Sequence, residues 1–322
     1  MANFYDVSDW IEKKYVVARG SRNKAIVENP DDRSLYYFKT SLQRSNDAYR
    51  YEFWSEIIAS AIGNELGFNT LHYDIAYNKD KIGCISKSMI DKTNNTFVEI
   101  IDYLRNYDNT YAPENKQSYT QYTFHFIESA LKAHKLANQV NQIIKTIIFD
   151  SLIGNGDRHQ ENWGFIIEIN NHKKQSNIRK LSNLLKSTSN NNTVVFSPIY
   201  DSGSCLGREL LDKDVEKFLL QTELLDRYIN NDRCEIRWED KKISHFELIR
   251  MFIGYTKYKD VVIQEIKRVI SVFNKDRIRQ IIYTIDENLP DNLNENKLPD
   301  NRKKLIVQLI LLRFDKLKEV LL

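Results

Sequence analysis

Short runs of apolar residues separated by polar turns fill the first third of the chain. Alternating apolar and polar positions are typical of a β-strand, whereas apolar positions spaced three and four apart are typical of a helix. The pattern predicts early strands, one helix and a later hairpin: Tyr15–Ala18, Ala25–Val27, Leu35–Lys39, the helix Glu52–Leu66, then Tyr73–Tyr77 with Ile82–Ile85. Gly67 follows the helix, as a C-terminal cap would.

Helical periodicity dominates from about Ile90 onward. It predicts helices at Phe124–Ala137, Val140–Ile153, Leu248–Tyr255, Val261–Phe273 and Arg302–Leu321. Two segments rich in β-branched and aromatic residues interrupt this pattern as paired strands, Trp163–Ile169 and Thr193–Tyr200, with a polar, solvated loop, Asn170–Asn192, between them. We therefore predict an α+β chain with a small β-rich N-lobe over residues 1–89 and a larger, mainly helical C-lobe over residues 90–322.

Composition narrows the class of protein without identifying it. The 322 residues are 42% hydrophobic and 28% charged, which fits a folded globular chain. A net charge of +3 gives no reason to expect direct nucleic-acid binding, and no apolar run reaches the roughly 20 residues of a membrane span. Three widely spaced cysteines without a CxxC pair and an N-terminus unlike a signal peptide predict a cytoplasmic protein. Export without a classical signal stays open.

The most informative run lies where a predicted helix gives way to a predicted strand. It reads FDSLIGNGDRHQENWGF and contains Asp157 and Asn162 with four residues between them. This is the spacing of the Asp and Asn in a protein-kinase catalytic loop, HRDxxxxN. A carboxylate at the hydroxyl being phosphorylated and an amide oxygen at a nearby Mg²⁺ can both be held by one short loop.

A second carboxylate is needed, because a neutral amide alone cannot anchor a divalent metal beside nucleotide phosphates. Asp201 supplies it in the run PIYDSG, directly after the second predicted strand, where a kinase carries Asp-Phe-Gly. Gly203 leaves the backbone free to turn at this point.

Together, GNGDRHQENWGF and SPIYDSGSCLG resemble the HipA-like Ser/Thr kinases. The resemblance implies a two-lobed protein-kinase-like fold, with ATP as phosphate donor and Mg²⁺ as cofactor. In its terms, Asp157 looks like the catalytic base, and Asn162 and Asp201 look like the Mg²⁺ ligands.

The resemblance also implies roles in the small lobe. Lys39, at the end of a strand, would contact the α and β phosphates, and Glu56 would orient it from the helix. Glu52, one helical turn earlier, is the rival partner of Lys39. The turn made by Gly20, Ser21, Arg22, Asn23 and Lys24 resembles the family's phosphate loop, although it departs from GxGxxG.

The order of these motifs places the adenine-binding hinge near residues 84–89, so Ser86 and Met89 are candidate neighbours of the nucleotide. His159 is grouped with them, with an expected role in hydrogen-bonding the catalytic loop. Autophosphorylation is a further expectation. The resemblance implies Ser21 as a site, and the polar loop adds Ser176, Ser182, Ser187, Thr188 and Ser189.

The sequence therefore predicts an ATP- and Mg²⁺-dependent kinase whose substrate is a protein with a Ser or Thr acceptor. Phosphoinositide-type lipid kinases share a GDRHxxN loop and remain an alternative, although the segment after Asp201 is mixed in charge rather than basic. A nucleotide-binding pseudokinase acting as an interaction module is the other. The family includes toxins held by an antitoxin, so an antitoxin-like partner stays open, as does a host-directed role.

Overall fold

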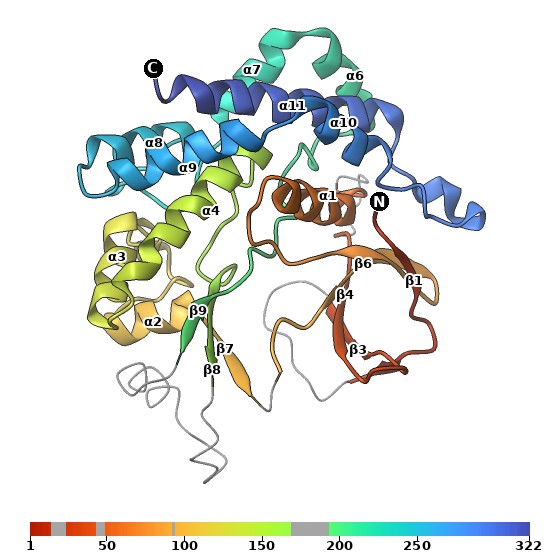
Figure 1. Cartoon of the computed structure of the whole chain (residues 1–322), viewed down its shortest axis with the longest axis horizontal. Helices are drawn as coiled ribbons and strands as arrows, with labels where there is room; N and C mark the ends of the chain where they lie inside the picture. Colours follow the sequence, from red (N-terminus) through yellow and green to blue (C-terminus); the bar gives the residue numbers. More distant parts are fainter. Residues whose placement is uncertain (14–23, 43–48, 92–93, 169–192) are drawn as a thin grey trace.

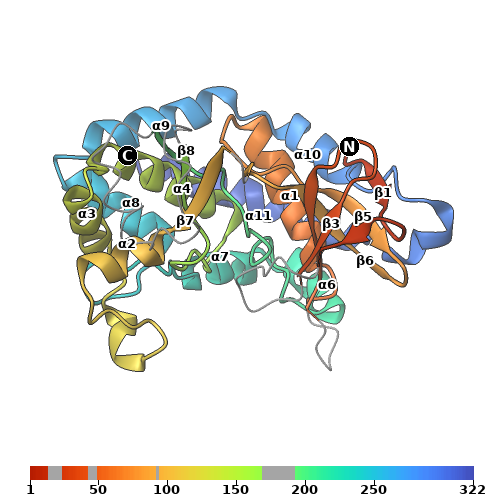
Figure 2. The same cartoon turned by 90° about the horizontal axis from the view of Figure 1, so that it is seen from below.

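The computed structural model of the chain describes residues 1–13, 24–42, 49–91, 94–168 and 193–322. Strands β1, β3, β5 and β6 gather at one end of the molecule, and helices α2, α3 and α8 lie at the other (Figure 2). The predicted strand Tyr15–Ala18 and the loop Asn170–Asn192 lie outside the described residues.

The small lobe is built on a six-stranded sheet with the order β1-β5-β6-β4-β3-β2. The strands β1 and β5 pair in parallel, and the other neighbours are antiparallel. Their bounds are β1 Phe4–Asp6, β2 Ile11–Glu12, β3 Lys24–Glu28, β4 Leu35–Thr40, β5 Asp74–Asn78 and β6 Lys81–Lys87. The predicted strands at 25–27 and 35–39 and the predicted hairpin are all present. The pattern did not reveal β1 and β2, which are only 3 and 2 residues long.

The two faces of this sheet have different neighbours. Phe38 of β4 packs with Val27 and Ile85 in a small apolar cluster on one face. Lys39 follows Phe38, and because side chains alternate along a strand it points to the opposite face. There it pairs in register with Cys84, which belongs to the larger core that includes α1 (Glu52–Glu65). The alternation thus directs a lysine toward a helix.

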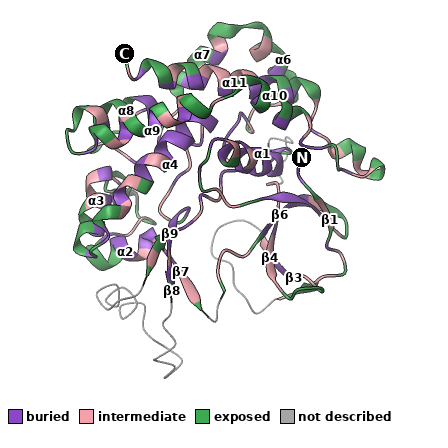
Figure 3. Ribbon diagram, in the orientation of Figure 1, coloured by how far each residue is buried: buried purple, intermediate pink, exposed green. Residues whose placement is uncertain are grey.

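Helix α1 is buried around most of its circumference, as its colouring shows in Figure 3. It packs on β4 and β6 of the sheet and on α10 of the large lobe, so it contacts both lobes. It ends as predicted, with Leu66 as the cap and Gly67 at φ +74° just beyond it. A left-handed backbone at this point suits glycine and stops the helix.

The large lobe surrounds α4 (Val140–Ile153), which packs against α8, α9 and α11 (Figure 1). Its elements are β7 Asn95–Glu99, α2 Ile100–Tyr107, η1 Lys116–Thr120, α3 Phe124–Ala133, η2 Ala137–Gln139, α4, β8 Gly164–Glu168, β9 Val194–Phe196, α6 Asp212–Leu220, α7 Thr222–Asn231, α8 His245–Gly254, α9 Lys259–Val272, α10 Lys275–Tyr283, η4 Asp291–Asn296 and α11 Asp300–Glu319. None of the described helices combines the length and the apolar character needed to cross a bilayer.

The two strands predicted in this lobe pair antiparallel as β8 and β9, and β7 completes a three-stranded sheet with them. One predicted helix is too long. The segment expected to be helical over Phe124–Ala137 leaves the α-helix after Ala133, because His134 caps the helix and Lys135 adopts φ +62°. The short η2 then continues the chain toward α4.

Candidate active site

Three predicted site residues meet where the lobes face each other. The Nζ of Lys39 is paired with Glu56 of α1 and with Asp201, which comes from the segment after β9. Lys39 is only 6% exposed, and a lysine this deeply buried needs a carboxylate to remain charged. The cluster therefore joins β4, α1 and the Asp201 segment through one cation.

The structure separates the roles of the two glutamates that the sequence left as rivals. Glu56 contacts Lys39, and its other oxygen accepts the backbone N–H of Ser202 at 2.8 Å. Glu52 instead pairs with Arg208 and accepts the backbone N–H of Leu42 at 3.0 Å. One turn of α1 therefore separates a carboxylate at Lys39 from a carboxylate at Arg208.

The predicted catalytic loop begins where α4 ends. Gly154 caps the helix at φ +71°, and a Cβ there would lie within 2.8 Å of the Arg313 guanidinium, so a side chain would be both strained and crowded. Asn155 follows and is fully buried. Its amide donates to Asp150 at 3.1 Å and its oxygen accepts the Asp157 N–H at 3.3 Å. The loop is thus fixed to the helix from which it emerges.

Arg158, which the sequence analysis did not single out, connects the loop to the Asp201 segment. Its guanidinium is 1% exposed and makes a two-point contact with Asp150 at 2.8 and 2.9 Å. It also donates to the carbonyl of Asn162 at 3.1 Å, to the carbonyl of Tyr200 and to the Ser202 hydroxyl at 3.2 Å. Burial opposes the charge, but the Asp150 carboxylate outweighs it, so the pKa of Arg158 stays above its ordinary value.

Asp157 precedes Arg158 in this loop, and the Asn162 carbonyl accepts from the Arg158 guanidinium. The Asn162 amide nitrogen donates to the Asp157 carbonyl at 2.7 Å, which leaves the amide oxygen as the atom available to a cation. The Asp157 carboxylate accepts a hydrogen bond from the Ser204 hydroxyl at 3.0 Å. The spacing that predicted Asp157 and Asn162 therefore belongs to a loop in which these two residues are hydrogen-bonded to each other.

Asp201 has a left-handed backbone with φ +54°, which is uncommon outside glycine and tolerated by Asp. The neighbouring hydrogen bonds of Tyr200 and Ser202, to Arg158 and Glu56, hold it there. Such a conformation persists only where its surroundings over-determine it, and it is common at functional sites.

The donor set suits Mg²⁺. Asn162 and Asp201 offer an amide and a carboxylate oxygen, and Arg158 bonds the carbonyls of both Asn162 and Tyr200, so the two backbone segments are neighbours. Mg²⁺ takes oxygen ligands, commonly one or two from protein with substrate phosphates completing the shell. Across the described ranges, no group of three or more His, Cys, Asp or Glu side chains is placed to hold a metal.

The other predicted residues occupy varied positions. Lys24 begins β3 and pairs in register with Lys39. Ser86 is buried in β6, and Met89 follows that strand, half-buried. His159 accepts the Glu161 N–H through its Nδ1 at 3.2 Å, a hydrogen bond within the loop. Gly20, Ser21, Arg22 and Asn23, and the five hydroxyl residues of the polar loop, lie outside the described residues.

Beneath the loop lies a buried charged cluster that the sequence gave no reason to expect. His245 Nδ1 is 3.1 Å from Asp232 and its Nε2 is 3.1 Å from the Asn155 carbonyl, while Arg313 contacts the same Asp232 oxygen at 3.1 Å. Burial alone would lower the pKa of His245, but Cys234 and Asp232 beside it raise the value to about 10. The same contacts hold the pKa of Asp232 below its ordinary value despite burial.

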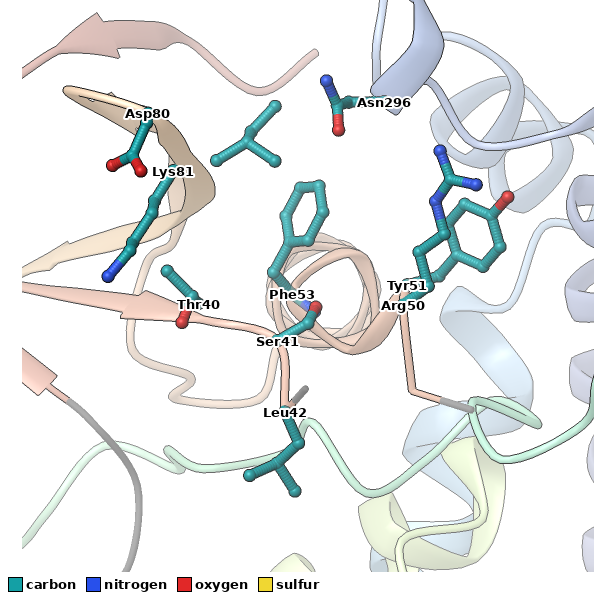
Figure 4. Close-up of a pocket in the computed structure, with 10 residues that line it drawn as sticks. Thr40, Ser41, Leu42, Arg50, Tyr51, Phe53, Asp80, Lys81 and Asn296 are labelled. Carbon is teal, nitrogen blue, oxygen red and sulfur yellow. The ribbon is translucent and has the colours of Figure 1, made fainter. Parts of the chain in front are cut away.

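A separate cavity of about 430 Å³ lies at the start of α1. It is bordered by the end of β4, the first residues of α1 and the β5–β6 turn (Figure 4). Lys39 immediately precedes its first lining residue, Thr40, and Phe53 lines it from the helix that carries Glu56. Among the described residues that line it, none is a predicted site residue, so this cavity is distinct from the Lys39 cluster.

The chain is similar to known kinases in sequence and in structure. No protein-family model matches the chain. It is similar to the serine/threonine-protein kinase CtkA of Helicobacter pylori, with 26% identity over 233 residues, which are 71% of this chain and 62% of CtkA. The match thus spans less than two thirds of that relative's length.

Two solved structures have the same fold. The Helicobacter pylori proinflammatory kinase CtkA superposes with a TM-score of 0.72 at 19% identity, over 98% of this chain and 95% of that one. HipA of Shewanella oneidensis MR-1, solved with HipB and operator DNA, gives a TM-score of 0.53 at 12% identity, over 94% and 65%. The molecule therefore has a two-lobed, protein-kinase-like fold. More particularly it is the HipA-like kinase fold, which confirms the resemblance seen in the two motifs.

Proposed function

We propose that this chain is a Ser/Thr protein kinase that transfers the γ-phosphate of ATP, with Mg²⁺, to a hydroxyl of a protein. The observation that carries the proposal is the meeting of Lys39, Glu56 and Asp201 beside a loop that presents Asp157 and Asn162. The sequence relative is itself named a Ser/Thr kinase, which supports the same conclusion.

Each residue has a role that its surroundings suit. Lys39, held by Glu56, binds the phosphates of ATP, and Asp157 accepts the proton of the attacking hydroxyl. Asn162 and Asp201 hold Mg²⁺, which neutralises negative charge on the phosphates when it is bound. Arg158 keeps both ligand-bearing segments in place, so most of the catalysis is positioning. Ser86, Met89, Lys24 and the turn at 20–23 complete the proposed ATP site.

Incubation with γ-labelled ATP and Mg²⁺ tests the proposal. The acceptors are myelin basic protein and, separately, phosphoinositide vesicles, and the variants are Asp157→Ala and Asp276→Ala. Asp276 is a matched control because its side chain is 76% exposed on α10. We expect label on protein, lost by a factor of about 10³ or more in Asp157→Ala and retained in Asp276→Ala.

The two alternatives give different results. Label on the vesicles alone would identify a lipid kinase. ATP binding without transfer to either acceptor would identify a nucleotide-binding module. Retained transfer by Asp157→Ala would contradict the assignment of the base.

We also propose a protein partner and a cellular compartment for this chain. The HipA structure contains HipB, so we propose that this chain also has a protein partner, to be sought by co-purification with the tagged chain. Cys84, Cys205 and Cys234 are buried free thiols, which suits a reducing cytoplasm.

A further inference from the structure

A hydroxyl of the chain itself contacts the proposed catalytic base. The Ser204 Oγ donates to the Asp157 carboxylate at 3.0 Å, within the reach that a general base needs to take a proton. Ser204 follows Asp201 by three residues, so the same short segment carries the proposed metal ligand and this hydroxyl. Ser204 is half-buried, so it remains partly exposed.

The segment that carries Ser204 is held on both sides. The Cys205 carbonyl accepts the Ser55 hydroxyl of α1 at 3.2 Å, and the Leu206 N–H donates to the Ile153 carbonyl of α4 at 3.0 Å. Leu206 and Gly207 both have left-handed backbone, with φ +58° and +72°. Contacts with α1 and α4 therefore hold the backbone just after Ser204, in addition to the hydrogen bonds that its side chain makes.

A cation stands beside the hydroxyl. Arg208 Nη2 donates to the Ser204 Oγ at 2.9 Å, while Nη1 pairs with Glu52. The guanidinium carbon lies 4.2 Å from the centre of the Tyr49 ring, which fixes its plane. A guanidinium in this place can bind the oxygens of a phosphoserine through charge-assisted hydrogen bonds.

We propose that Ser204 is a phosphorylation site that the chain's own active site modifies in cis. The inference rests on the proposed kinase function. The Ser204 oxygen forms a bond to the γ-phosphorus of ATP, and the bond from that phosphorus to the β–γ bridging oxygen breaks. ADP leaves with the electron pair. The hydroxyl proton passes to Asp157 and from there to solvent.

The product limits further catalysis. A phosphoserine carries a charge of about −1.5 to −2 and would lie against the Asp157 carboxylate. Repulsion from Asp157 and attraction to Arg208 hold the phosphate between these two side chains, where it blocks the approach of another hydroxyl to Asp157. A protein substrate can then no longer place its hydroxyl at Asp157, so the chain loses its activity on other proteins after one phosphorylation of Ser204.

A simpler role for Ser204 is to orient Asp157 without being modified. The two roles differ in one measurable result, because an orienting hydroxyl acquires no phosphate. Ser204→Thr separates them further, since it keeps the hydroxyl and should yield phosphothreonine, whereas Ser204→Ala removes the acceptor.

The experiment mixes two full-length chains that differ in isotope. Wild type grown in ¹⁵N is incubated with Mg·ATP in the presence of unlabelled Asp157→Ala. Peptides that contain Ser204 are then fragmented by mass spectrometry, which distinguishes phosphate on Ser204 from phosphate on Ser202. Unlabelled Asp201→Asn serves as a second inactive chain, and circular dichroism verifies that both are folded. Ser271→Ala is the matched control, an exposed hydroxyl on α9.

We expect phosphate on Ser204 of the ¹⁵N chain only, approaching one per chain, with a half-time that is constant over a hundredfold range of protein concentration. Activity on myelin basic protein should fall about tenfold or more as Ser204 fills and return after phosphatase treatment. The Ser271→Ala chain should behave as wild type in each respect.

Each contrary result is decisive. Phosphate on Ser204 of the unlabelled chains would overturn modification in cis. An unmodified Ser204 in a preparation that phosphorylates myelin basic protein would overturn this inference and leave the kinase function standing. Absence of phosphate on Ser204 and on every added acceptor would overturn both this inference and the proposed kinase function.

Discussion

His245 shows how one buried side chain can support the proposed catalytic loop without touching Asp157 or Asn162. Its two ring nitrogens face two acceptors, the Asp232 carboxylate and the Asn155 carbonyl. A neutral imidazole has a single N–H and can donate to only one of them, so the doubly protonated ring is the form that satisfies both. Arg313 and Cys234 also face this cluster.

The protonation of His245 should make stability depend on pH. Its pKa is raised from 6.5 to about 10 on folding, so its contribution is fully present below about pH 6.5 and is lost as pH rises through about 10. Wild type should exceed His245→Gln in free energy of unfolding by about 2–3 kcal/mol at pH 6, and this difference should shrink toward pH 10. Urea titrations of both proteins across this range measure the difference. A difference that does not change between pH 6 and pH 10 would show that the ring is neutral in the folded state.

At the scale of elements, α1 carries two buried carboxylates with separate partners, and this arrangement gives the helix its proposed function. Glu56→Gln keeps the shape of the side chain but removes one of the two carboxylates paired with Lys39, so the lysine is held less firmly at the proposed phosphate site. We expect kcat/KM for ATP to fall by about 100-fold with little change in fold, because misplacing a positioning group is enough to cause such a loss.

Glu65→Gln is the matched control for Glu56→Gln. Glu65 lies at the end of the same helix and pairs on the surface with Arg277, whose side chain is 50% exposed. Its loss should leave kcat/KM within about twofold, because exposed pairs contribute little. Equal rates for wild type and Glu56→Gln would mean that Lys39 does not depend on α1.

The sequence predicted those elements whose patterns are local. The alternation around Phe38 and Lys39, the apolar periodicity of α1 and the glycine after it are set by neighbours a few residues away, and the structure has each of them. The loop with Asp157 and Asn162 was recognisable for the same reason, because its residues lie within one short run and their spacing identifies them.

The contacts that sequence reasoning missed join residues remote in the chain. Arg158 reads as a surface arginine until Tyr200 and Ser202 are placed beside it. Ser204 contacts Asp157, and Arg208 pairs with Glu52. Both contacts depend on how α1 packs against the loop, and no local sequence pattern predicts that packing. One signal was available in the run Asp157-Arg158-His159. The Asp and the His had expected roles, whereas the arginine between them had none.

The choice between Glu52 and Glu56 illustrates the same limit. Both lie on the same side of one helix, one turn apart, and helical periodicity cannot distinguish them. In the structure Glu56 contacts Lys39, whereas Glu52 pairs with Arg208, which lies 156 residues further along the chain. The strand β7 was also missed, because its pairing with β8 joins segments about 70 residues apart.

At the scale of the whole molecule, the two lobes are joined by partly buried polar contacts around α1. The Trp54 indole donates to the Asn296 carbonyl at 2.9 Å, and Arg268 of α9 donates to the carbonyl of Leu66. The Lys39 pair with Asp201 crosses between the lobes at the proposed nucleotide site. A ligand held by both residues would therefore tie the lobes together, so its binding should stabilise the entire chain.

Mg·ATP should accordingly raise the free energy of unfolding of wild type by about 2.7 kcal/mol at a free concentration near 100 times its Kd. Chelation of Mg²⁺ with excess EDTA should remove most of this increase, because in the proposed site Asp201 and Asn162 would bind the nucleotide through the metal. Asp201→Asn should show only the small increase that ATP gives in EDTA, and Asp276→Asn should match wild type. Thermal melts with and without metal measure all three proteins. An equal increase in Asp201→Asn and wild type would place the metal elsewhere, since a site that includes Asp201 cannot lose its carboxylate and keep its affinity.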